Sequence, residues 1–444
     1  MSSAKLRVLV LLIGDAAILY LSLIATLLLR YQGAAYHELL DHHLAPFSVI
    51  FIFWIVVFYI AGLYDIRRLH NNLSFLKTLL VAIILNAMLA VLFFYFTTIF
   101  GIAPKTNFFT FLGIFTALEF FWRRFSIVRL ASRDSLTRVL MIGSGETAQL
   151  IHNAVHSNPQ LGYTITRWLK GEREPVTADI IREAIAERDI ELVLISRSLK
   201  EESAIQSTLY DLLNAGIDVR DFRNFHEVVL QKVPVAELDP SWFISDTSEA
   251  EKFYDPLKRA LEFIGAALML IILLPLELLI ALIIRATSSG PIVYRQQRVG
   301  QHGSPFMLYK FRTMRQDAEK HGAEWSRPND NRVTSFGKLL RHSHLDELPQ
   351  LWNIVKGELS FVGPRPERPE FVSVLAKEIP FYAIRHLITP GITGWAQINY
   401  RYGSSVQDAK EKLEYDLYYL KNRSLIVDGA IILKTIKLFF INNS

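Results

Sequence analysis

The chain has 444 residues, of which 51% are hydrophobic and 20% charged, and its formal net charge at pH 7 is +5. Such a length accommodates two or three domains, and so apolar a composition is rich for a soluble protein, so a membrane component is the first expectation. The chain has no cysteine, which excludes a disulfide framework and a thiolate metal site and fits a cytoplasmic catalytic face.

Four apolar runs near the amino terminus predict a four-helix transmembrane bundle within residues 1–130. The first three have the length, roughly 17 to 25 residues, that crosses about 30 Å of hydrocarbon, and the fourth is marginal. Asp15 lies inside the first run, where a carboxylate is costly in lipid. We expect it to face a neighbouring helix, with a functional role as the alternative. The runs extend from about Val8 to Leu29, Pro46 to Leu63, Leu79 to Phe96 and Phe108 to Trp122.

Positive charges on the short connections set the expected orientation of this bundle. Lysines and arginines occur before the first run, between the second and third, and after the fourth, whereas the other two connections hold little beyond Arg30 and Lys105. We therefore expect both ends of the bundle, and everything after it, on the cytoplasmic side. The first run is also too long, and too interrupted by Asp15, to be a cleavable signal peptide.

Residues 137–248 alternate short apolar strands with charged amphipathic stretches, which predicts a Rossmann-like α/β domain. Arg138–Ile142 is expected as a strand that leads through a tight turn into a helix. The spacing Gly143-x-Gly145-x-x-Ala148 lets a phosphate approach a helix N-terminus. Because no acidic residue is clearly placed to hold a ribose, we favour a structural or regulatory domain over a nucleotide site.

A fifth apolar segment, residues 257–285, predicts a re-entrant membrane helix. Pro275 lies inside it, and proline removes a helical hydrogen bond and clashes with the preceding turn, so the helix should bend sharply or stop. Basic residues flank both ends, which favours a segment that enters the membrane and returns. An ordinary kinked transmembrane helix is the alternative, and it would place all later residues outside the cell.

Residues 286–444 are expected to form an α/β catalytic domain. Its first part is basic, because ten Lys and Arg stand against four Asp and Glu from Arg285 to Lys338, as suits an anionic ligand or lipid headgroups. Phe306–Arg312 predicts a strand with Lys310 and Arg312 on one face. Two cations on one face suit a diphosphate, and a solvated strand edge is the alternative.

The segment from Arg341 to Trp352 is the most informative in the chain. Asp346 suits a helix N-cap, and Gly357 is placed to end the helix. Adjacent carboxylates at a helix start, Asp346 and Glu347, gain from the helix dipole, and the same place would hold a phosphate or a metal-bound phosphate. Plain capping is the alternative.

Two later segments point to the same place. In Ser360–Glu367 the side chain of Arg365 is presented between two prolines with little backbone freedom, for a phosphate or a base edge. Thr389–Gln397 is a Gly-rich loop that could wall a nucleotide site or merely turn the chain. Three such segments close together in the sequence argue for one site.

From Lys258 to the C-terminus the chain resembles the bacterial sugar transferase domain of the monotopic polyprenyl-phosphate phosphoglycosyl transferases. The helices and α/β domain before it resemble, in architecture, the large exopolysaccharide-associated branch of that family. Glu262 lies where the family usually has Asp, and His344 where a small residue is common. The matching stretches are Ser289–Gly300, Tyr309–Met314, Leu345–Leu351, Val362–Pro366 and Pro390–Gln397.

The resemblance implies an enzyme that transfers a sugar 1-phosphate from a UDP-sugar to undecaprenyl phosphate and releases UMP, as the first membrane step of exopolysaccharide, capsule or O-antigen synthesis. It implies Asp346 as the nucleophile of a covalent aspartyl-phosphosugar intermediate. The Asp346 and Glu347 pair would hold Mg²⁺, with Mn²⁺ as an alternative. The residues implied to bind substrate are Lys310, Arg312, Arg341, Arg365 and Gln397.

The implied location is the bacterial inner membrane, with a cytoplasmic catalytic domain. Membrane lipids are further expected partners, a homodimer is a hypothesis, and no nucleic acid is expected. One alternative function is an inactive membrane scaffold or regulator of polysaccharide synthesis. Another is a membrane-bound nucleotide-sugar dehydratase, which needs a Tyr-x-x-x-Lys pair on one helix. The only such spacing is Tyr254 to Lys258, and Pro256 inside it argues against a helical pair. The sugar itself is not predicted, and Glu324–Asn331 is our hypothesis for where it is selected.

Overall fold

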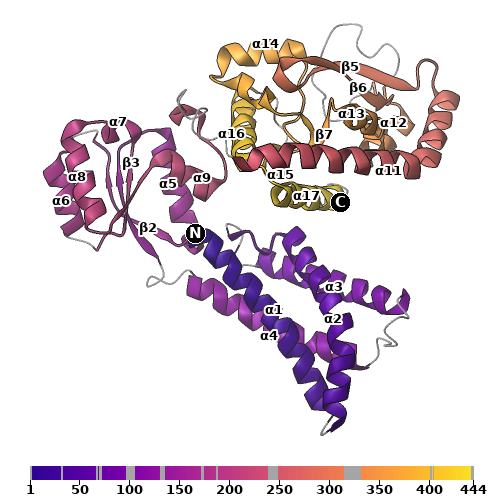
Figure 1. Ribbon diagram of the computed structural model, residues 1–444, viewed down its shortest axis with the longest axis horizontal. Helices are drawn as coiled ribbons and strands as arrows, with labels where there is room; N and C mark the ends of the chain where they lie inside the picture. The colour runs from indigo at the N-terminus through magenta and orange to yellow at the C-terminus, as the bar shows by residue number, and fades with distance from the viewer. Residues whose placement is uncertain are drawn as a thin grey trace. The chain divides into compact units, whose positions relative to one another are not determined.

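The computed structural model describes residues 3–31, 34–66, 69, 73–96, 106–130, 136–171, 175–186, 189–238, 249–314, 332–400, 403 and 405–441. The chain divides into an amino-terminal unit, residues 1–230, and a carboxyl-terminal unit, residues 231–444 (Figure 1). The hypothesised selection loop Glu324–Asn331 lies outside the described residues.

The amino-terminal unit begins with the four predicted helices. Helices α1 to α3 contain segments long and apolar enough to cross a membrane, at Leu6–Arg30, Leu39–Ala61 and Phe75–Phe96. Helix α4 forms as well, but Glu119 and several arginines make it less apolar than the other three, in line with its marginal sequence signal. The helices are α1 (Ser3–Arg30), α2 (Ala34–Ala61), α3 (Leu73–Phe96) and α4 (Thr106–Leu130).

Asp15 faces a neighbouring helix, as predicted. Its side chain is fully buried and forms an ion pair with Arg123 of α4. The Tyr64 hydroxyl donates to Asp15 Oδ2 at 2.7 Å, and the Trp122 indole N–H donates to Oδ1 at 2.9 Å. Arg123 in turn donates to Glu119 and to the Leu63 carbonyl, each at 2.8 Å. Both oxygens of this intramembrane carboxylate are therefore used to hold helices together.

A four-stranded parallel sheet in the order β2-β1-β3-β4 follows the helices. Alternate residues of β1 feed two apolar clusters, because Val139 and Met141 pack with α5 and α9 while Leu140 and Ile142 pack with α6 and α8. The sheet is thus covered on both faces, as parallel sheets require. The elements are β1 (Thr137–Ile142), α5 (Glu146–Ser157), β2 (Tyr163–Leu169), α6 (Ala178–Ala186), β3 (Leu192–Ile195), α7 (Arg197–Lys200), α8 (Ser203–Asn214), β4 (Asp218–Asp221) and α9 (Phe222–Leu230).

The glycine turn between β1 and α5 has a structural explanation. Gly143 and Gly145 have φ values of 118° and 119°, which L side chains rarely adopt. A Cβ at Gly143 would lie 2.7 Å from the side chain of Ser196, and the Trp168 indole donates to the Gly143 carbonyl at 2.7 Å. Packing therefore accounts for the first glycine without a bound nucleotide.

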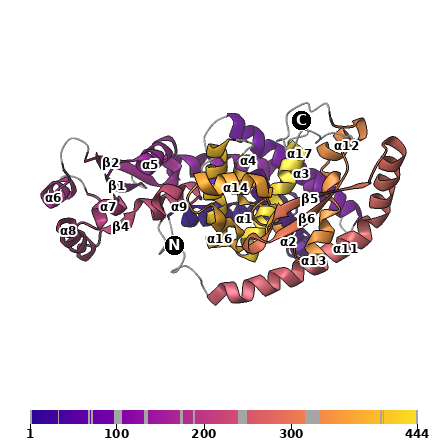
Figure 2. The same cartoon turned by 90° about the horizontal axis from the view of Figure 1, so that it is seen from above.

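The carboxyl-terminal unit is built on one long helix, α11 (Glu249–Thr287), which contains both Pro256 and Pro275. Its segment Phe253–Thr287 is also long and apolar enough to cross a membrane. Of the two outcomes predicted at Pro275, a sharp bend or a stop, the stop is wrong: the helix continues through Pro275 to Thr287, and Figure 2 shows its ribbon changing direction along its length. Proline is a common cause of a change of direction in a helix that otherwise continues, because it removes one hydrogen bond and clashes with the preceding turn.

Short strands and helices pack along α11. An antiparallel hairpin, β5 and β6, contacts α13, and a parallel pair, β7 and β8, lies beside α17. The elements are η5 (Val235–Glu237), β5 (Val293–Val299), β6 (Pro305–Phe311), α12 (Ser335–His342), η7 (Leu345–Glu347), α13 (Gln350–Lys356), β7 (Ser360–Val362), α14 (Pro369–Glu378), η8 (Tyr382–Leu387), β8 (Gly391–Thr393), α15 (Trp395–Asn399), α16 (Val406–Asn422) and α17 (Leu425–Ile441).

Candidate active site

The predicted carboxylate pair lies in a tight turn between two helices. Helix α12 ends at His342, His344 adopts a left-handed conformation with φ 53°, and Asp346 and Glu347 follow in the 3-10 turn η7. The expectation that Asp346 is a helix N-cap is wrong, because α13 begins only at Gln350 and Pro349 occupies the cap position. Gly357 ends α13 in the left-handed conformation, as predicted.

Glu347 is held by two cations from distant parts of the sequence. Lys310 Nζ on β6 donates to Glu347 Oε1 at 2.6 Å, and Arg365 Nη2 lies 3.3 Å from the same oxygen. Burial alone would raise the pKa of Glu347, but Arg365 and Lys310 together hold it at about 2. The structure therefore joins three of the predicted residues around a carboxylate that is ionised at neutral pH.

Asp346 has a contrasting environment one residue away. Its side chain is 8% exposed, and among the described residues it has no hydrogen-bond or ion-pair partner. Burial raises the pKa of Asp346 and the neighbouring Glu347 charge adds to this, whereas Lys310 and Arg341 act in the opposite direction. A buried carboxylate without a partner is a candidate for a reacting group.

The segment that presents Arg365 is clamped through its backbone. Four successive carbonyls, from Pro364 to Glu367, each accept one hydrogen bond from a fixed donor. These donors are Gly391 N at 2.9 Å, Arg385 Nη2 at 3.0 Å, Arg298 Nη1 at 2.9 Å and Val299 N at 3.0 Å. Because the two prolines already restrict φ, the backbone at Arg365 has little freedom left.

Arg385, which supplies one of these donors, is itself fixed by a buried ion pair. Its guanidinium lies 2.8 Å from Asp416 on α16 and donates to the Tyr382 hydroxyl at 2.7 Å. Both Arg385 and Asp416 are more than nine-tenths buried. Sequence reasoning missed this pair, and the only signal available was an arginine within the otherwise apolar stretch 381–388.

The three remaining residues predicted to bind substrate, Arg341, Arg312 and Gln397, form contacts with other parts of the unit. Arg341 donates to Thr313 Oγ1 at 2.9 Å and acts on Asp346 through its charge. Arg312 follows the end of β6 and donates to the Ser288 carbonyl at 2.9 Å, and no contact among the described residues joins it to the carboxylate pair. Gln397 on α15 donates to the Ile392 carbonyl at 2.8 Å and likewise has no described contact with the pair.

The Gly-rich loop is explained by packing of two backbones. A Cβ on Gly391 would lie 2.1 Å from Gly363 N, and one on Gly394 would lie 2.2 Å from Gly363 O. Trp395, the aromatic of this loop, is buried, stacks on Tyr418 and donates to the Gln231 carbonyl at 2.9 Å. Packing therefore accounts for the glycines of this loop and for Trp395.

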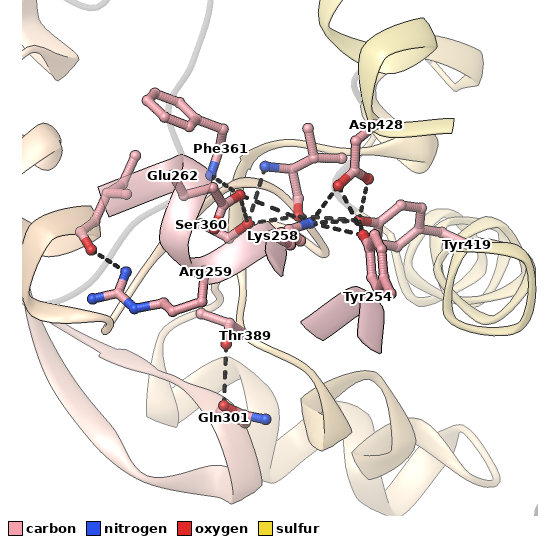
Figure 3. A network of polar contacts seen from close by, with 12 residues as sticks. Tyr254, Lys258, Arg259, Glu262, Gln301, Ser360, Phe361, Thr389, Tyr419 and Asp428 are labelled. Atoms are coloured by element: carbon pink, nitrogen blue, oxygen red, sulfur yellow. Dashed lines mark hydrogen bonds and ion pairs between the residues drawn. The ribbon is translucent and has the colours of Figure 1, made fainter. Parts of the chain in front are cut away.

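A buried polar network that the sequence analysis did not anticipate joins α11 to the rest of the unit (Figure 3). Lys258 Nζ lies 2.9 Å from Asp428 Oδ2, and it donates to the Val362 carbonyl at 2.7 Å and to the Tyr419 hydroxyl at 2.8 Å. The Tyr254 hydroxyl also donates to Asp428, at 2.8 Å. Elements α11, β7, α16 and α17 are thus tied at one point.

This network corrects one argument about the dehydratase alternative. Pro256 does not prevent Tyr254 and Lys258 from lying on one helix, and Lys258 Nζ is 3.2 Å from the Tyr254 hydroxyl. However, the Lys258 ammonium is already bound by Asp428 and the Val362 carbonyl. The pair has the spacing of a catalytic Tyr-Lys pair but the contacts of a structural one.

Two residues near Lys258 on α11, Arg259 and Glu262, connect this helix to β7 and to α13, which follows the turn that carries Asp346 and Glu347. Glu262 accepts from Ser360 Oγ and, at 3.0 Å, from Phe361 N, so the longer acid present here reaches β7. Arg259 donates to the Ile354 carbonyl and, at 2.8 Å, to the Val355 carbonyl at the end of α13. A cation at a helix C-terminus is favourable, and it fixes the helix that follows Asp346 and Glu347 to α11.

The fit of the carboxylate pair to a divalent cation can be judged from its partners. Within the part of the chain that the structure describes, no group of three or more His, Asp or Glu residues is placed to hold a metal ion. Mg²⁺, however, is commonly held by one or two carboxylates together with waters and substrate phosphates. Asp346, whose oxygens have no described protein partner, and Glu347 beside it fit that kind of site.

The chain is similar to a known family and to several curated proteins. The family described as bacterial sugar transferase matches residues 253–442. A UDP-N-acetylgalactosamine-undecaprenyl-phosphate N-acetylgalactosaminephosphotransferase of Aeromonas hydrophila is 44% identical over 184 residues, which cover 41% of this chain and 44% of that protein. A UDP-glucose:undecaprenyl-phosphate glucose-1-phosphate transferase of Xanthomonas campestris pv. campestris is 32% identical over 322 residues, 67% of this chain and 65% of its own length.

A shorter relative is covered more completely. A UDP-glucose:undecaprenyl-phosphate glucose-1-phosphate transferase of Caulobacter vibrioides is 38% identical over 184 residues, which are 41% of this chain and 69% of that protein. The first two relatives are each spanned over less than two thirds of their length. The region matched by the family model begins within α11 and includes the turn that carries Asp346 and Glu347 and the segment Pro364–Glu367.

Proposed function

Because this chain belongs to the bacterial sugar transferase family, we propose that it transfers a sugar 1-phosphate from a UDP-sugar to undecaprenyl phosphate and releases UMP. The observation that carries the proposal is the contrast within one turn: Glu347 is ion-paired with two cations, and Asp346 beside it has no partner among the described residues. The names of the relatives from Aeromonas, Xanthomonas and Caulobacter support the same donor and acceptor classes.

The proposed first step uses Asp346 as a nucleophile. One carboxylate oxygen of Asp346 attacks the β-phosphorus of the UDP-sugar, the bond from that phosphorus to the bridging oxygen breaks, and UMP leaves. The sugar phosphate is then held as an acyl phosphate on Asp346. In the second step a phosphate oxygen of undecaprenyl phosphate attacks the same phosphorus, which forms the lipid diphosphate sugar and regenerates the carboxylate. An acyl phosphate is reactive enough to transfer to so weak a nucleophile.

The cations of the site have distinct tasks in this scheme. In this proposal Lys310 and Arg365, which hold Glu347, would also bind the diphosphate, and Arg341 adds positive charge near Asp346. A bound Mg²⁺, or Mn²⁺, held by Asp346 and Glu347 would neutralise phosphate charge that otherwise repels a carboxylate. The clamp on Pro364–Glu367 keeps Arg365 in place without reorganisation.

We also propose that α11 is re-entrant and that the catalytic unit lies on the cytoplasmic face of a bacterial inner membrane. The same unit contacts both ends of this helix: Lys258 binds β7 and α17 near one end, and Ile284 packs against Phe311 and Leu340 near the other. A helix that crossed about 30 Å of hydrocarbon would place its ends on opposite sides. Contacts of one folded unit with both ends therefore support a segment that returns.

The test is UMP release from a panel of UDP-sugars by detergent-purified protein with Mg²⁺ and undecaprenyl phosphate, for wild type and Asp346→Asn. We expect one or a few sugars to give UMP with wild type and none with the variant. The donor that reacts identifies the sugar. If no donor gives UMP, or if the variant keeps full activity, the aspartyl mechanism is wrong and an inactive scaffold becomes the better interpretation.

A further inference from the structure

Arg312 is a buried cation whose hydrogen-bonding capacity is only partly used. Its side chain is 8% exposed, and Nη2 donates to the Ser288 carbonyl at 2.9 Å. Nη1 is buried and has no hydrogen-bond partner. The Ser288 carbonyl, just after α11, therefore accounts for Nη2 but not for Nη1. A buried charged donor without a partner is costly.

A second cation lies beside it. Arg285 is in the last turn of α11 and is exposed. Burial lowers the pKa of Arg312, and the positive charge of Arg285 lowers it further. In the part of the chain that the structure describes, neither arginine has a carboxylate partner. Two neighbouring guanidinium groups without an acidic partner form a site for an anion, and guanidinium groups suit phosphate oxygens in particular.

The location of this pair relates it to both the membrane and the reacting carboxylate. Ile280 and Ile284, in the two turns before Arg285, share an apolar cluster with Phe311, which directly precedes Arg312. Leu345 and Leu348, which flank the carboxylate pair, pack against the same cluster. The cations and the turn that carries Asp346 are therefore attached to one packed core.

The side of α11 that does not enter this cluster is apolar and uncovered within the unit. Leu278 is 62% exposed, Leu279 54% and Leu282 67%. Long apolar side chains therefore lead along the helix up to the arginine pair. An anion at this place whose remainder is a hydrocarbon chain would satisfy both features, whereas a free phosphate would satisfy only the first.

We propose that Arg285 and Arg312 bind the phosphate monoester of the acceptor lipid, with the polyprenyl chain along Leu278 and Leu282; this inference rests on the proposed function. Lys310 and Arg312, two positions apart in the sequence, then serve different substrates. Lys310 points to Glu347 and the donor, whereas Arg312 points to Ser288 and the acceptor. The pair would deliver a lipid phosphate to the intermediate from the membrane side while the donor enters from the solvent.

The test separates acceptor binding from turnover. Wild type, Arg312→Gln, Arg312→Lys and Arg285→Gln are placed in phosphatidylcholine nanodiscs, and binding of undecaprenyl phosphate is measured without any donor. The control is Arg295→Gln, because Arg295 is an exposed arginine on β5 that lies over the ring of Tyr309 on β6. Phosphatidylglycerol and inorganic phosphate are tested as competitors. KM values for donor and acceptor are then determined for each variant.

We expect Arg312→Gln and Arg285→Gln each to bind undecaprenyl phosphate at least about tenfold more weakly, because each loses a charged hydrogen bond. Both should raise the acceptor KM more than the donor KM. Arg312→Lys should recover part of the affinity, and Arg295→Gln should behave as wild type. Neither competitor should displace the acceptor at equal concentration. Displacement by phosphatidylglycerol would identify a general lipid site and overturn the proposal.

Two further outcomes distinguish this proposal from the function on which it rests. A rise in donor KM with unchanged acceptor binding would assign Arg312 to the donor and overturn the inference alone. If wild type binds undecaprenyl phosphate but releases no UMP from any donor, the proposed function fails while the lipid-phosphate site stands. Arg285→Gln changes an exposed side chain, so a folding defect of the Arg312 variants leaves the test valid.

Discussion

Asp15 in the amino-terminal unit and Asp346 in the carboxyl-terminal unit are both buried carboxylates, and their surroundings differ completely. Asp15 uses both oxygens, with Arg123, Tyr64 and the Trp122 indole as partners. Asp346 has no such partner among the described residues, although Lys310 and Arg341 act on it through their charges. Burial by itself therefore does not distinguish a structural acid from a reacting one.

The two carboxylates differ in whether their oxygens are free to bind or attack a ligand. A fully paired buried ion contributes to the packing of helices, and loss of one partner leaves the other charge uncompensated. A buried acid without a partner costs stability, and such a cost is tolerated where a ligand will later supply the missing interactions. The predictions below test this contrast by changing residues of each kind.

The largest effect is expected for Asp346→Asn. We expect the rate of UMP release to fall by at least about a thousandfold, because an amide oxygen cannot replace the carboxylate nucleophile. The melting temperature should stay the same or rise slightly, since the variant removes a buried charge that has no described partner. UMP assays and thermal unfolding of the same preparation check both parts, and a marked loss of stability would contradict the contrast.

Asp15→Asn should show the opposite behaviour. We expect a loss of about 3 kcal/mol in stability, because the Arg123 guanidinium would keep its charge in a buried position without this partner. The turnover rate per folded molecule should change little. Thermal unfolding in detergent measures the first quantity. The control combines Asp15→Asn with Arg123→Met and Glu119→Gln, since removing all three charges of this buried group should recover part of the loss.

Arg385 tests whether a structural ion pair can control a reacting group. Arg385→Ala removes the donor to the Arg365 carbonyl and leaves Asp416 unpaired. We expect kcat/KM for the UDP-sugar to fall roughly ten- to a hundredfold, with a larger change in the donor KM than in the acceptor KM. Arg385→Lys should recover part of the activity, because an ammonium can still reach Asp416. A fall in apparent kcat with both KM values unchanged would indicate a smaller folded fraction instead.

Much of the fold follows from local patterns in the sequence. Hydropathy predicts the four amino-terminal helices, and the alternation of short strands with amphipathic segments predicts the parallel sheet, because both signals lie within single elements. The hairpin strand that carries Lys310 is predicted for the same reason. The prediction of Asp346 as an N-cap is wrong, since the 3-10 turn that follows the left-handed His344 lies between it and the start of α13.

The missed residues depend on contacts between distant segments. Lys258 meets Asp428 and Tyr419 across more than 160 positions, and Arg385 meets the Arg365 carbonyl through a turn that no local pattern specifies. The separation of Lys310 from Arg312 has the same origin. The two share one strand face in the sequence pattern, but Lys310 binds Glu347 whereas Arg312 binds the carbonyl of Ser288, just after α11.

The pH dependence of the first step should reflect Asp346 and not Glu347. Burial raises the pKa of Asp346 above its ordinary value, and only the ionised form attacks, so the rate of UMP release should fall as the pH drops through that raised pKa. Glu347, with a pKa of about 2, stays ionised throughout this range. Its depressed pKa contributes stability that is present above the unfolded-state pKa and is lost toward pH 2. Arg341→Gln removes a charge that lowers the pKa of Asp346, so its acid limb should move to higher pH, and a shift to lower pH would contradict this assignment.

The smallest effect is expected for Tyr254→Phe. The variant removes one hydroxyl from the network around Lys258 and leaves the ion pair between Lys258 and Asp428 intact, so we expect a stability loss of about 1 kcal/mol and nearly unchanged transfer. Lys258→Met should be far more harmful to stability, since Asp428 would lose its cation. If Tyr254→Phe abolished activity in a stable protein, the pair would be part of the chemistry. The presence or absence of hydrogen-bond and ion-pair partners at a buried group would then no longer separate structural from reacting residues in this chain.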